Sequence, residues 1–168
     1  IEIIREEKPD VLFPQSSAEV IALSKNKDVL EKEGVKVLIS SEDAVYKSEN
    51  KAELYKTLEN TSVKIPNFRV VNSLDEFLDA VKSLGYPGTP VCFKPPISKG
   101  TRGFRILRDD ISRKHILLNE RPINRFISIN EFKEIFEGDS DFPELLVMEF
   151  VEGEEHTTDP LTRNGKTL

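Results

Sequence analysis

Residues 90–107 contain two apolar runs of the β type, separated by a short loop rich in glycine and cationic side chains. The first run covers residues 91–94 and ends on a lysine, and the second covers residues 104–107. The loop between them, residues 98–103, reads Ser-Lys-Gly-Thr-Arg-Gly. Short apolar runs bounded by proline and glycine predict two strands joined by a tight connection.

This loop has features that suit the binding of an anion. Its glycines allow backbone N–H groups to approach oxygen atoms that a Cβ would keep away, and Lys94 supplies a positive charge from a strand. Such a loop could fold over nucleotide phosphates, and we expect it to be poorly ordered until a nucleotide closes it. A plainer interpretation stays open, because alternation places Lys94 opposite Val91 and Phe93, where it could face water above an ordinary hairpin.

Composition restricts the class of protein. The chain has 168 residues, of which 38% are hydrophobic and 32% are charged, which is typical of a soluble globular protein with one core or two small lobes. A net charge of −6 argues against broad nucleic-acid binding. No apolar run reaches membrane-spanning length, and the single cysteine, Cys92, lies in an apolar run and predicts a buried side chain. These features predict a cytoplasmic protein without membrane or nucleic-acid partners.

The first third of the chain alternates strand and helix patterns. Residues 10–14 predict a short buried strand, residues 17–33 a helix ended by Gly34, and residues 35–39 a second strand. Two strands joined by a helix imply a parallel unit with a right-handed crossover. No G-x-G-x-x-G fingerprint is present. Two more helices are expected, at residues 41–46 and 51–60, before a break at Ile65-Pro66.

The middle of the chain predicts a second unit. Strands are expected at residues 63–71 and, fully buried, at 144–151. Two helices begin with the capping-box pattern, in which a serine N-cap is followed three residues later by glutamate. Their expected buried residues are, in the first helix, Leu74, Phe77, Leu78 and Val81, and in the second, Phe132, Ile135 and Phe136. The pattern indicates an antiparallel sheet carrying two helices, and residues 109–127 have no clear pattern.

The segment after the last buried strand is acidic. Glu149 ends the strand, where a carboxylate is unusual without a partner, and it could accept a hydrogen bond from an exocyclic amine. The backbone of Phe150 and Val151 could offer one N–H and one C=O to an adenine edge. Alternation places Glu155 with Thr157 and Asp159 on one face, where a carboxylate could hold ribose hydroxyls. A solvated acidic turn is the alternative.

Taken together, four segments resemble the ATP-grasp superfamily, especially its carbamoyl-phosphate-synthase-like members. In order along the chain, they are Asn50-Lys51 with Ile65-Pro66, the lysine motif Phe93-Lys94-Pro95-Pro96, the glycine loop at residues 98–103, and the acidic segment at residues 148–155. The first 40 residues resemble the end of the Rossmann-like domain that precedes the grasp. Some positions depart from the family pattern: Asn50 replaces an aspartate, His156 stands where an aromatic is common, and Pro160 interrupts an expected strand.

The resemblance implies an α/β (α+β) fold. Residues 1–45 would be the C-terminal part of a pre-ATP-grasp domain, and residues 46–168 the ATP-grasp domain. Within the latter we expect a lobe at 64–148, a hinge at 149–151 and the start of a second lobe at 152–168. Sequence is expected to be missing on both sides, because the chain opens on the tail of an amphipathic helix and closes in an Asn-Gly hairpin at residues 163–168.

By the same resemblance, the ATP-binding residues are Lys51, Lys94, Ser98, Lys99, Gly100, Thr101, Arg102, Gly103, Glu149, Phe150, Val151 and Glu155. The lysines and the loop would bind phosphates, Glu149 to Val151 adenine, and Glu155 ribose. The implied cofactors are ATP and Mg²⁺, with the metal ligands expected downstream of this chain, and no catalytic residue is assigned.

The family's reaction phosphorylates a carboxylate or bicarbonate with ATP, and an amine then attacks the acyl phosphate. The resemblance therefore implies part of an ATP-dependent ligase, inactive by itself, with ATP, an acid and an amine as partners, and it leaves a homodimer open. The alternative is a nucleotide-binding regulatory or phosphotransferase module without ligase activity. A pure interaction domain, in which nothing binds at Lys94, is a weaker third hypothesis.

Overall fold

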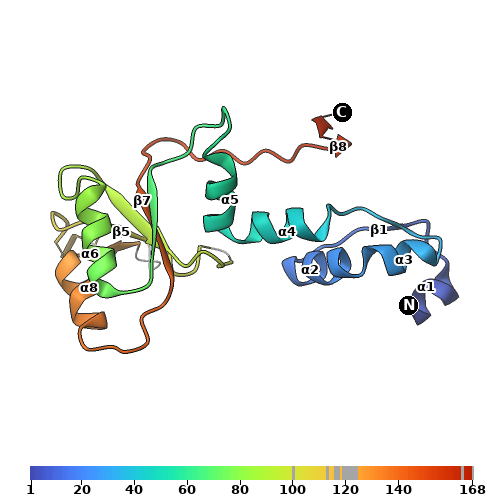
Figure 1. Ribbon diagram of the computed structural model, residues 1–168, viewed down its shortest axis with the longest axis horizontal. Coiled ribbons are helices and arrows are strands. Elements are labelled where there is room, and N and C mark those ends of the chain that lie inside the picture. The colour runs from blue at the N-terminus through green and yellow to red at the C-terminus, as the bar shows by residue number, and fades with distance from the viewer. Residues whose placement is uncertain (100, 113, 116–117, 119–124, 164, 168) are drawn as a thin grey trace.

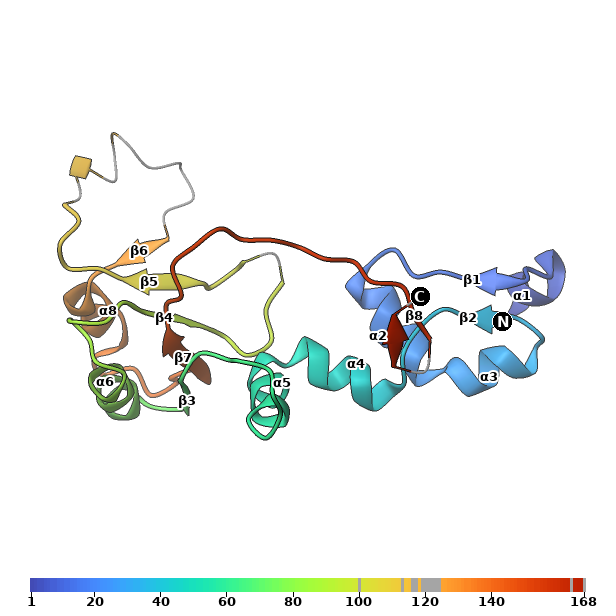
Figure 2. The same ribbon diagram turned by 90° about the horizontal axis from the view of Figure 1, so that it is seen from above.

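The molecule is elongated, with a helical N-terminal unit at one end and a five-stranded sheet at the other (Figures 1 and 2). The computed structural model describes residues 1–168 except 100, 113, 116–117, 119–124, 164 and 168. Two consecutive helices, α4 (Glu42–Glu49) and α5 (Lys51–Leu58), connect the two ends. None of the described helices is long and apolar enough to cross a membrane.

The N-terminal unit contains the predicted parallel strand pair. Its elements are α1 (Glu2–Glu7), β1 (Val11–Leu12), α2 (Ser17–Lys25), α3 (Lys27–Lys32) and β2 (Lys36–Val37). Val11 pairs with Lys36 and Leu12 with Val37, which confirms the parallel pairing. The expected single helix is interrupted at Asn26, and the burial expected for residues 10–14 is wrong, because Val11 is 45% and Phe13 is 66% exposed.

The junction between α4 and α5 explains the asparagine that departs from the family pattern. The buried Asn50 is the N-cap of α5, and its side-chain oxygen accepts hydrogen bonds from the backbone N–H groups of Ala52 at 3.0 Å and Glu53 at 3.2 Å. Asparagine and aspartate both have the short oxygen-bearing side chain that this position requires. The cap fixes the start of α5, where the N–H of Lys51 donates to Pro96 O.

The large sheet is mixed and has the strand order β3-β7-β4-β5-β6. Its strands are β3 (Phe68–Val71), β4 (Val91–Lys94), β5 (Arg105–Leu107), β6 (Phe126–Ile127) and β7 (Leu145–Glu149). Three neighbouring pairs are antiparallel, as expected, but β5 and β6 are parallel. The expectation of a purely antiparallel sheet is therefore wrong at this edge, because β6 comes from the part of the sequence that had no clear pattern.

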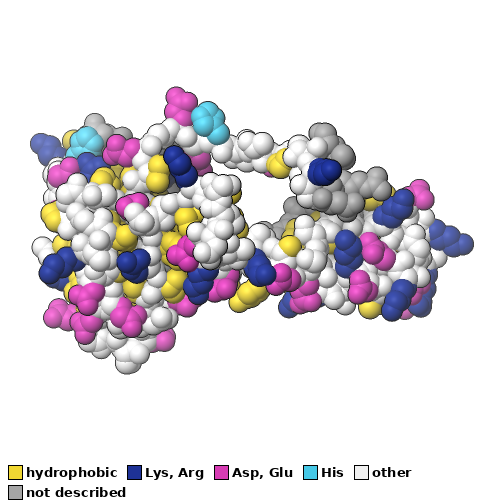
Figure 3. Space-filling view, turned by 45° about the horizontal axis from the view of Figure 1, so that its top comes forward, with side chains coloured by type: hydrophobic (Ala, Val, Ile, Leu, Met, Phe, Trp, Pro, Cys, Tyr) yellow, Lys and Arg dark blue, Asp and Glu magenta, His cyan; other side chains and the backbone are white. Residues whose placement is uncertain are grey.

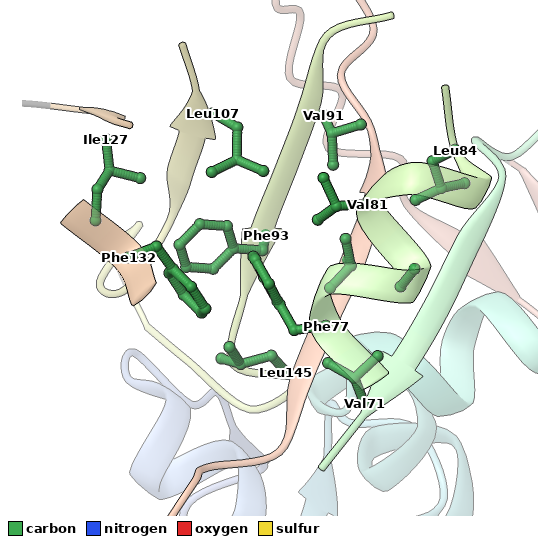
Figure 4. Close-up of a cluster of buried hydrophobic side chains, with 12 residues drawn as sticks. Val71, Phe77, Val81, Leu84, Val91, Phe93, Leu107, Ile127, Phe132 and Leu145 are labelled. Atoms are coloured by element: carbon green, nitrogen blue, oxygen red, sulfur yellow. The ribbon is translucent and has the colours of Figure 1, made fainter. Parts of the chain in front are cut away.

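Helices α6 (Leu74–Ser83) and α8 (Ile129–Phe136) pack on one face of this sheet. Figure 4 shows their aromatic side chains meeting the sheet, and Phe77 stacks on Phe132 with ring centroids 3.8 Å apart. Ser73 and Ser128 cap the two helices as predicted, accepting from the N–H groups three residues on. The Glu76 carboxylate, however, accepts from the N–H of Asn72 rather than from that of the N-cap.

The expected helix faces are largely confirmed. Phe77, Val81 and Phe132 are buried, and Leu74, Leu78 and Phe136 pack against them. The burial expected for Ile135 is wrong, since this side chain is 55% exposed.

The other face of the sheet, called the site face below, carries a second core. Cys92, Leu146 and Met148 are buried there, with Ala52 and Tyr55 of α5 packed against them. Strand alternation therefore places Cys92 and Lys94 on the site face and Val91 and Phe93 under α6 and α8, as the sequence predicts. Helix α5 covers part of the site face, and the rest borders a cavity.

After β7 the chain runs back toward the N-terminal unit as residues 150–161, which form neither helix nor strand. Figure 3 shows an opening between the two units that this returning chain borders. The strand-like alternation expected around Glu155 and Asp159 is therefore absent. The chain then forms the predicted antiparallel hairpin of β8 (Thr162–Arg163) and β9 (Lys166–Thr167).

Candidate functional site

A cavity of about 530 Å³ lies on the site face, where segments distant in sequence meet. Its lining residues are Lys51, Lys94, Ser98, Thr101, Phe104, Arg125, Phe150, Val151, Glu152, Gly153, Glu154 and Glu155. Seven of these were expected as ligand-binding residues from the sequence, and the structure brings them together. The cations of the lining are Lys51 at the start of α5, Lys94 at the end of β4 and Arg125 next to β6, and its carboxylates belong to the returning chain.

Two lysines define the cationic part. The N–H of Lys51 donates to Pro96 O, and its Nζ donates to Ser98 O, both at 3.0 Å, which fixes the start of α5 against the glycine loop. The half-buried Lys94 has no carboxylate partner among the described residues. Burial, and secondly the nearby charge of Lys51, lower the pKa of Lys94. Two lysines that line one cavity, neither paired with a carboxylate among the described residues, favour the binding of an anion there.

At the end of the glycine loop, the backbone of Gly103 lies close to the ring of Pro95. Gly103 has φ of +74°, and a Cβ at this position would lie 2.6 Å from Cδ of Pro95, so only glycine fits without a shift. Thr101 also has positive φ, +60°, and lines the cavity. Three expected residues, Lys99, Arg102 and Gly103, are not among those that line it, and Gly100 lies outside the described residues.

The hinge after β7 has one of its expected hydrogen-bonding groups in use. Phe150 N–H donates to Pro90 O at 2.9 Å, which continues the pairing of β7 with β4. An N–H for the edge of a base therefore falls to Val151, which is 72% exposed at the cavity. Glu155 also lines the cavity, as expected, beside Glu152 and Glu154.

Glu149 points elsewhere. Its carboxylate accepts hydrogen bonds from Asn67 N at 3.1 Å and Asn67 Nδ2 at 2.7 Å, while its own N–H donates to Asn67 O at 3.0 Å. These bonds to Asn67 lower the pKa of Glu149. The residue is not part of the cavity lining, because strand alternation directs it away from Met148 and the site face. The structure thus gives this carboxylate a partner other than the exocyclic amine expected from the sequence.

The other reactive side chains offer little chemistry. Burial raises the pKa of Cys92 to about 11, so its thiol stays protonated at neutral pH. His156 is exposed and lies 3.5 Å from the Glu154 carboxylate. The described residues include no group of three or more His, Cys, Asp and Glu side chains that could hold a metal ion.

Five lining residues were not among the expected binding residues: Phe104, Arg125, Glu152, Gly153 and Glu154. Phe104 precedes β5 and packs against the core of the site face. Arg125 immediately precedes β6, and the only signal for it was one cation in front of the two β-type residues Phe126 and Ile127. Glu152 lies between the hinge and Glu155. An acidic side chain in this segment is equally typical of a solvated turn, so its charge did not mark it as a lining residue.

Comparison with solved structures defines the class of fold. The chain superposes on an ATP-grasp RimK domain protein from Sphaerobacter thermophilus with a TM-score of 0.55, 16% identity and coverage of 87% of this chain and 46% of that one. An ADP complex of N5-carboxyaminoimidazole ribonucleotide synthetase superposes with a TM-score of 0.54 and 15% identity, over 84% of this chain and 30% of that one. D-alanine–D-alanine ligase from Bacillus anthracis superposes with a TM-score of 0.53 and 18% identity, over 90% of this chain and 43% of that one. The chain therefore has part of the ATP-grasp fold, as expected.

Sequence comparison points to one branch of these proteins. The N-terminal section of the carbamoyl phosphate synthase large chain from Aquifex aeolicus is 29% identical over 145 residues, which are 80% of this chain and 25% of that protein. The large chain from Thermotoga neapolitana is 25% identical over 130 residues, 73% of this chain and 12% of that protein. No family model matches the chain. The resemblance to carbamoyl-phosphate-synthase-like ATP-grasp proteins is confirmed, and the chain spans a quarter or less of the length of these two relatives.

Proposed function

We propose that this chain is the ATP-binding part of an ATP-grasp carboxylate–amine or bicarbonate–amine ligase that works through an acyl phosphate. The observation that carries the proposal is the cavity that unites Lys51, Lys94, the glycine loop, the hinge and Glu155. These residues come from a helix start, a strand end, a loop and the returning chain. A solvent-facing Lys94 on an ordinary hairpin would not require the lysine of a separate helix beside it.

Each part of the cavity has a proposed role. Lys51 and Lys94 bind the phosphates, and the loop at residues 98–103 closes over them. Val151, with the backbone of Phe150, holds adenine, and Glu155 accepts hydrogen bonds from the ribose hydroxyls. In this proposal residues 1–45 belong to a pre-ATP-grasp domain and residues 46–168 to the grasp, whose lobe at 64–148 meets the hinge at 149–151 and the start of a second lobe at 152–168.

Two of the structural neighbours support a nucleotide ligand. The N5-carboxyaminoimidazole ribonucleotide synthetase structure is an ADP complex. A second structure of the Bacillus anthracis ligase, with a TM-score of 0.51, is a complex with ATP. Their sequence identities are 15% and 18%, and for this chain it is the lysines, the loop and the hinge around the cavity that support a nucleotide ligand.

The chemistry that this chain's residues can supply is the binding and neutralisation of a phosphoryl group. Phosphoryl transfer depends mainly on positioning and on charge stabilisation, which lysines and backbone N–H groups provide here. The resemblance implies Mg²⁺ as well, but the described residues do not offer a ligand set for it. We therefore expect the chain by itself to bind nucleotide and to release no ADP in response to an acid.

The test is nucleotide binding by this protein, measured by calorimetry with and without Mg²⁺, followed by an assay of ADP release with bicarbonate or carboxylic acids and ammonia. Binding of ATP without acid-dependent ADP release is the expected result for the chain, and ADP release is expected from a longer protein that contains it. Failure to bind ATP would overturn the proposed function. ATP binding, with no acid-dependent ADP release even in the longer protein, would favour the regulatory alternative over a ligase.

A further inference from the structure

Arg125 is held at the cavity by its backbone. It lies immediately before β6, and its carbonyl accepts the N–H of Ile106 at 2.7 Å. The parallel pairing of Ile106 with Phe126 continues this contact and fixes Arg125 beside β5. Arg125 thus reaches the cavity from the sheet edge, two strands away from Lys94. Two strand spacings are roughly 10 Å, a distance that an arginine side chain and a chain of phosphates together can span.

The guanidinium of Arg125 differs from the others that the structure describes. Arg5 and Arg108 pair with the carboxylates of Glu33 and Asp110. The remaining guanidiniums, those of Arg69, Arg102 and Arg105, donate to backbone carbonyls. Within the described part of the chain, Arg125 makes neither kind of contact although carboxylates outnumber cations, 30 to 24. Its donors are therefore available to a ligand.

The charges around the cavity indicate which ligand group Arg125 would meet. Lys51, Lys94 and Arg125 are the cations that line it, and the lining carboxylates all come from residues 152–155 of the returning chain. A nucleoside triphosphate carries more negative charge than two lysines can neutralise. Lysines act as point charges, whereas a guanidinium binds a phosphate through two parallel N–H donors. A terminal phosphate presents several free oxygens and therefore suits these paired donors best.

We propose that Arg125 is a third phosphate-binding residue of this site and that it contacts the terminal phosphate of a bound nucleoside triphosphate. The proposal rests on the proposed nucleotide-binding function and extends it.

The experiment measures affinities for ATP, ADP and adenosine in the wild-type protein and in Arg125→Gln, Arg125→Lys and Arg105→Gln. Arg105 is the matched control, because it lies on β5, the strand next to Arg125, but is not part of the cavity lining. Inorganic tripolyphosphate, as a competitor of ATP, reports the phosphate contacts without the nucleoside. Thermal unfolding of each variant verifies that it folds, and the exposed Arg125 side chain should tolerate both changes.

We expect Arg125→Gln to weaken the binding of ATP and tripolyphosphate about 10- to 100-fold, the scale of a charge-assisted contact. The affinity for ADP should fall less, and the affinity for adenosine should not change. Arg125→Lys should recover part of this loss, and Arg105→Gln should bind like the wild type. An unchanged ATP affinity in Arg125→Gln would overturn this inference but leave the proposed function intact, provided that the wild type binds ATP. An equal loss for ATP and adenosine would also overturn it.

Discussion

The two faces of the large sheet are built from the same strands but differ in kind. Under α6 and α8 the sheet buries an aromatic cluster in which Phe77, Phe93 and Phe132 contact one another. The site face buries aliphatic and sulfur-containing side chains such as Leu146 and Met148 together with Phe68, and it ends at a cavity lined by charges. Strand alternation lets one sheet separate the two tasks, so that the aromatic core lies on the helix face and the proposed ligand-binding cavity on the other.

The largest expected effect tests this division through packing. Phe132→Ala should lower the free energy of unfolding by about 3–5 kcal/mol, because it removes a 1% exposed ring from the centre of the helix-face cluster. Phe104→Ala, on the site face, is the matched control and should cost much less, since this side chain is only partly buried at the cavity. Urea unfolding measures both free energies, and equal losses would show that the two faces contribute equally to stability.

A second change asks whether the site face is rigid where its loop returns to the sheet. Gly103→Ala should cost about 2–4 kcal/mol, since alanine meets both an unfavourable positive φ and Pro95. Gly138→Ala, at the end of α8, has a similar φ of +79° and nothing within 4 Å of the added Cβ, so it should cost about 1–2 kcal/mol. Similar losses in chemical denaturation would mean that the contact with Pro95 is unimportant.

A third change separates binding from stability on the site face. Lys94→Met should weaken ATP binding by about 1.5–3 kcal/mol and leave adenosine binding unchanged, because a charge-assisted contact is lost. Its unfolding free energy should not fall, since the native state already disfavours the charged form of this lysine. Lys82→Met, at an exposed position on α6 outside the cavity lining, is the control. A similar loss for adenosine and ATP would contradict the phosphate role.

The lowered pKa of Lys94 also gives this change a pH signature. The folded pKa lies below the ordinary value of 10.5, so the native state loses its proton first as pH rises. The cost of the buried charge is therefore complete below the folded pKa and is relieved between that pKa and 10.5. Wild-type stability should gain relative to Lys94→Met across this window, and ATP affinity should begin to fall there.

The smallest expected effect concerns Glu149. Glu149→Gln should lower the unfolding free energy by about 0.5–1 kcal/mol, because one of two hydrogen bonds to Asn67 is lost, and adenosine affinity should stay the same. Since the folded pKa of Glu149 is lowered, its contribution is present above the ordinary value of 4.5 and disappears as pH falls through the folded value. Glu155→Gln should show the opposite pattern, with weaker adenosine binding and unchanged stability. Loss of adenosine affinity in Glu149→Gln would restore the adenine contact inferred from the sequence.

Much of the local structure could be predicted from the sequence, because its causes are local. The serines at positions 73 and 128 start helices through their own side chains, and Gly85 and Gly138 follow the ends of those helices with positive φ. Alternation in residues 91–94 correctly placed Lys94 and Cys92 on one face. The order of the four motifs was enough to identify the ATP-grasp resemblance.

The tertiary structure decided what depends on contacts distant in sequence. Strand β7 lies between β3 and β4, and it is this pairing, extended by Asn67, that occupies the Glu149 carboxylate. Strand β6 has two residues, too few for a pattern, and exists because β5 offers it hydrogen bonds. Arg125 reaches the cavity only through that pairing, and Lys51 only through the contact of α5 with Pro96 and Ser98. Local propensity sets the elements, whereas the partner across the sheet sets which side chains meet at the site.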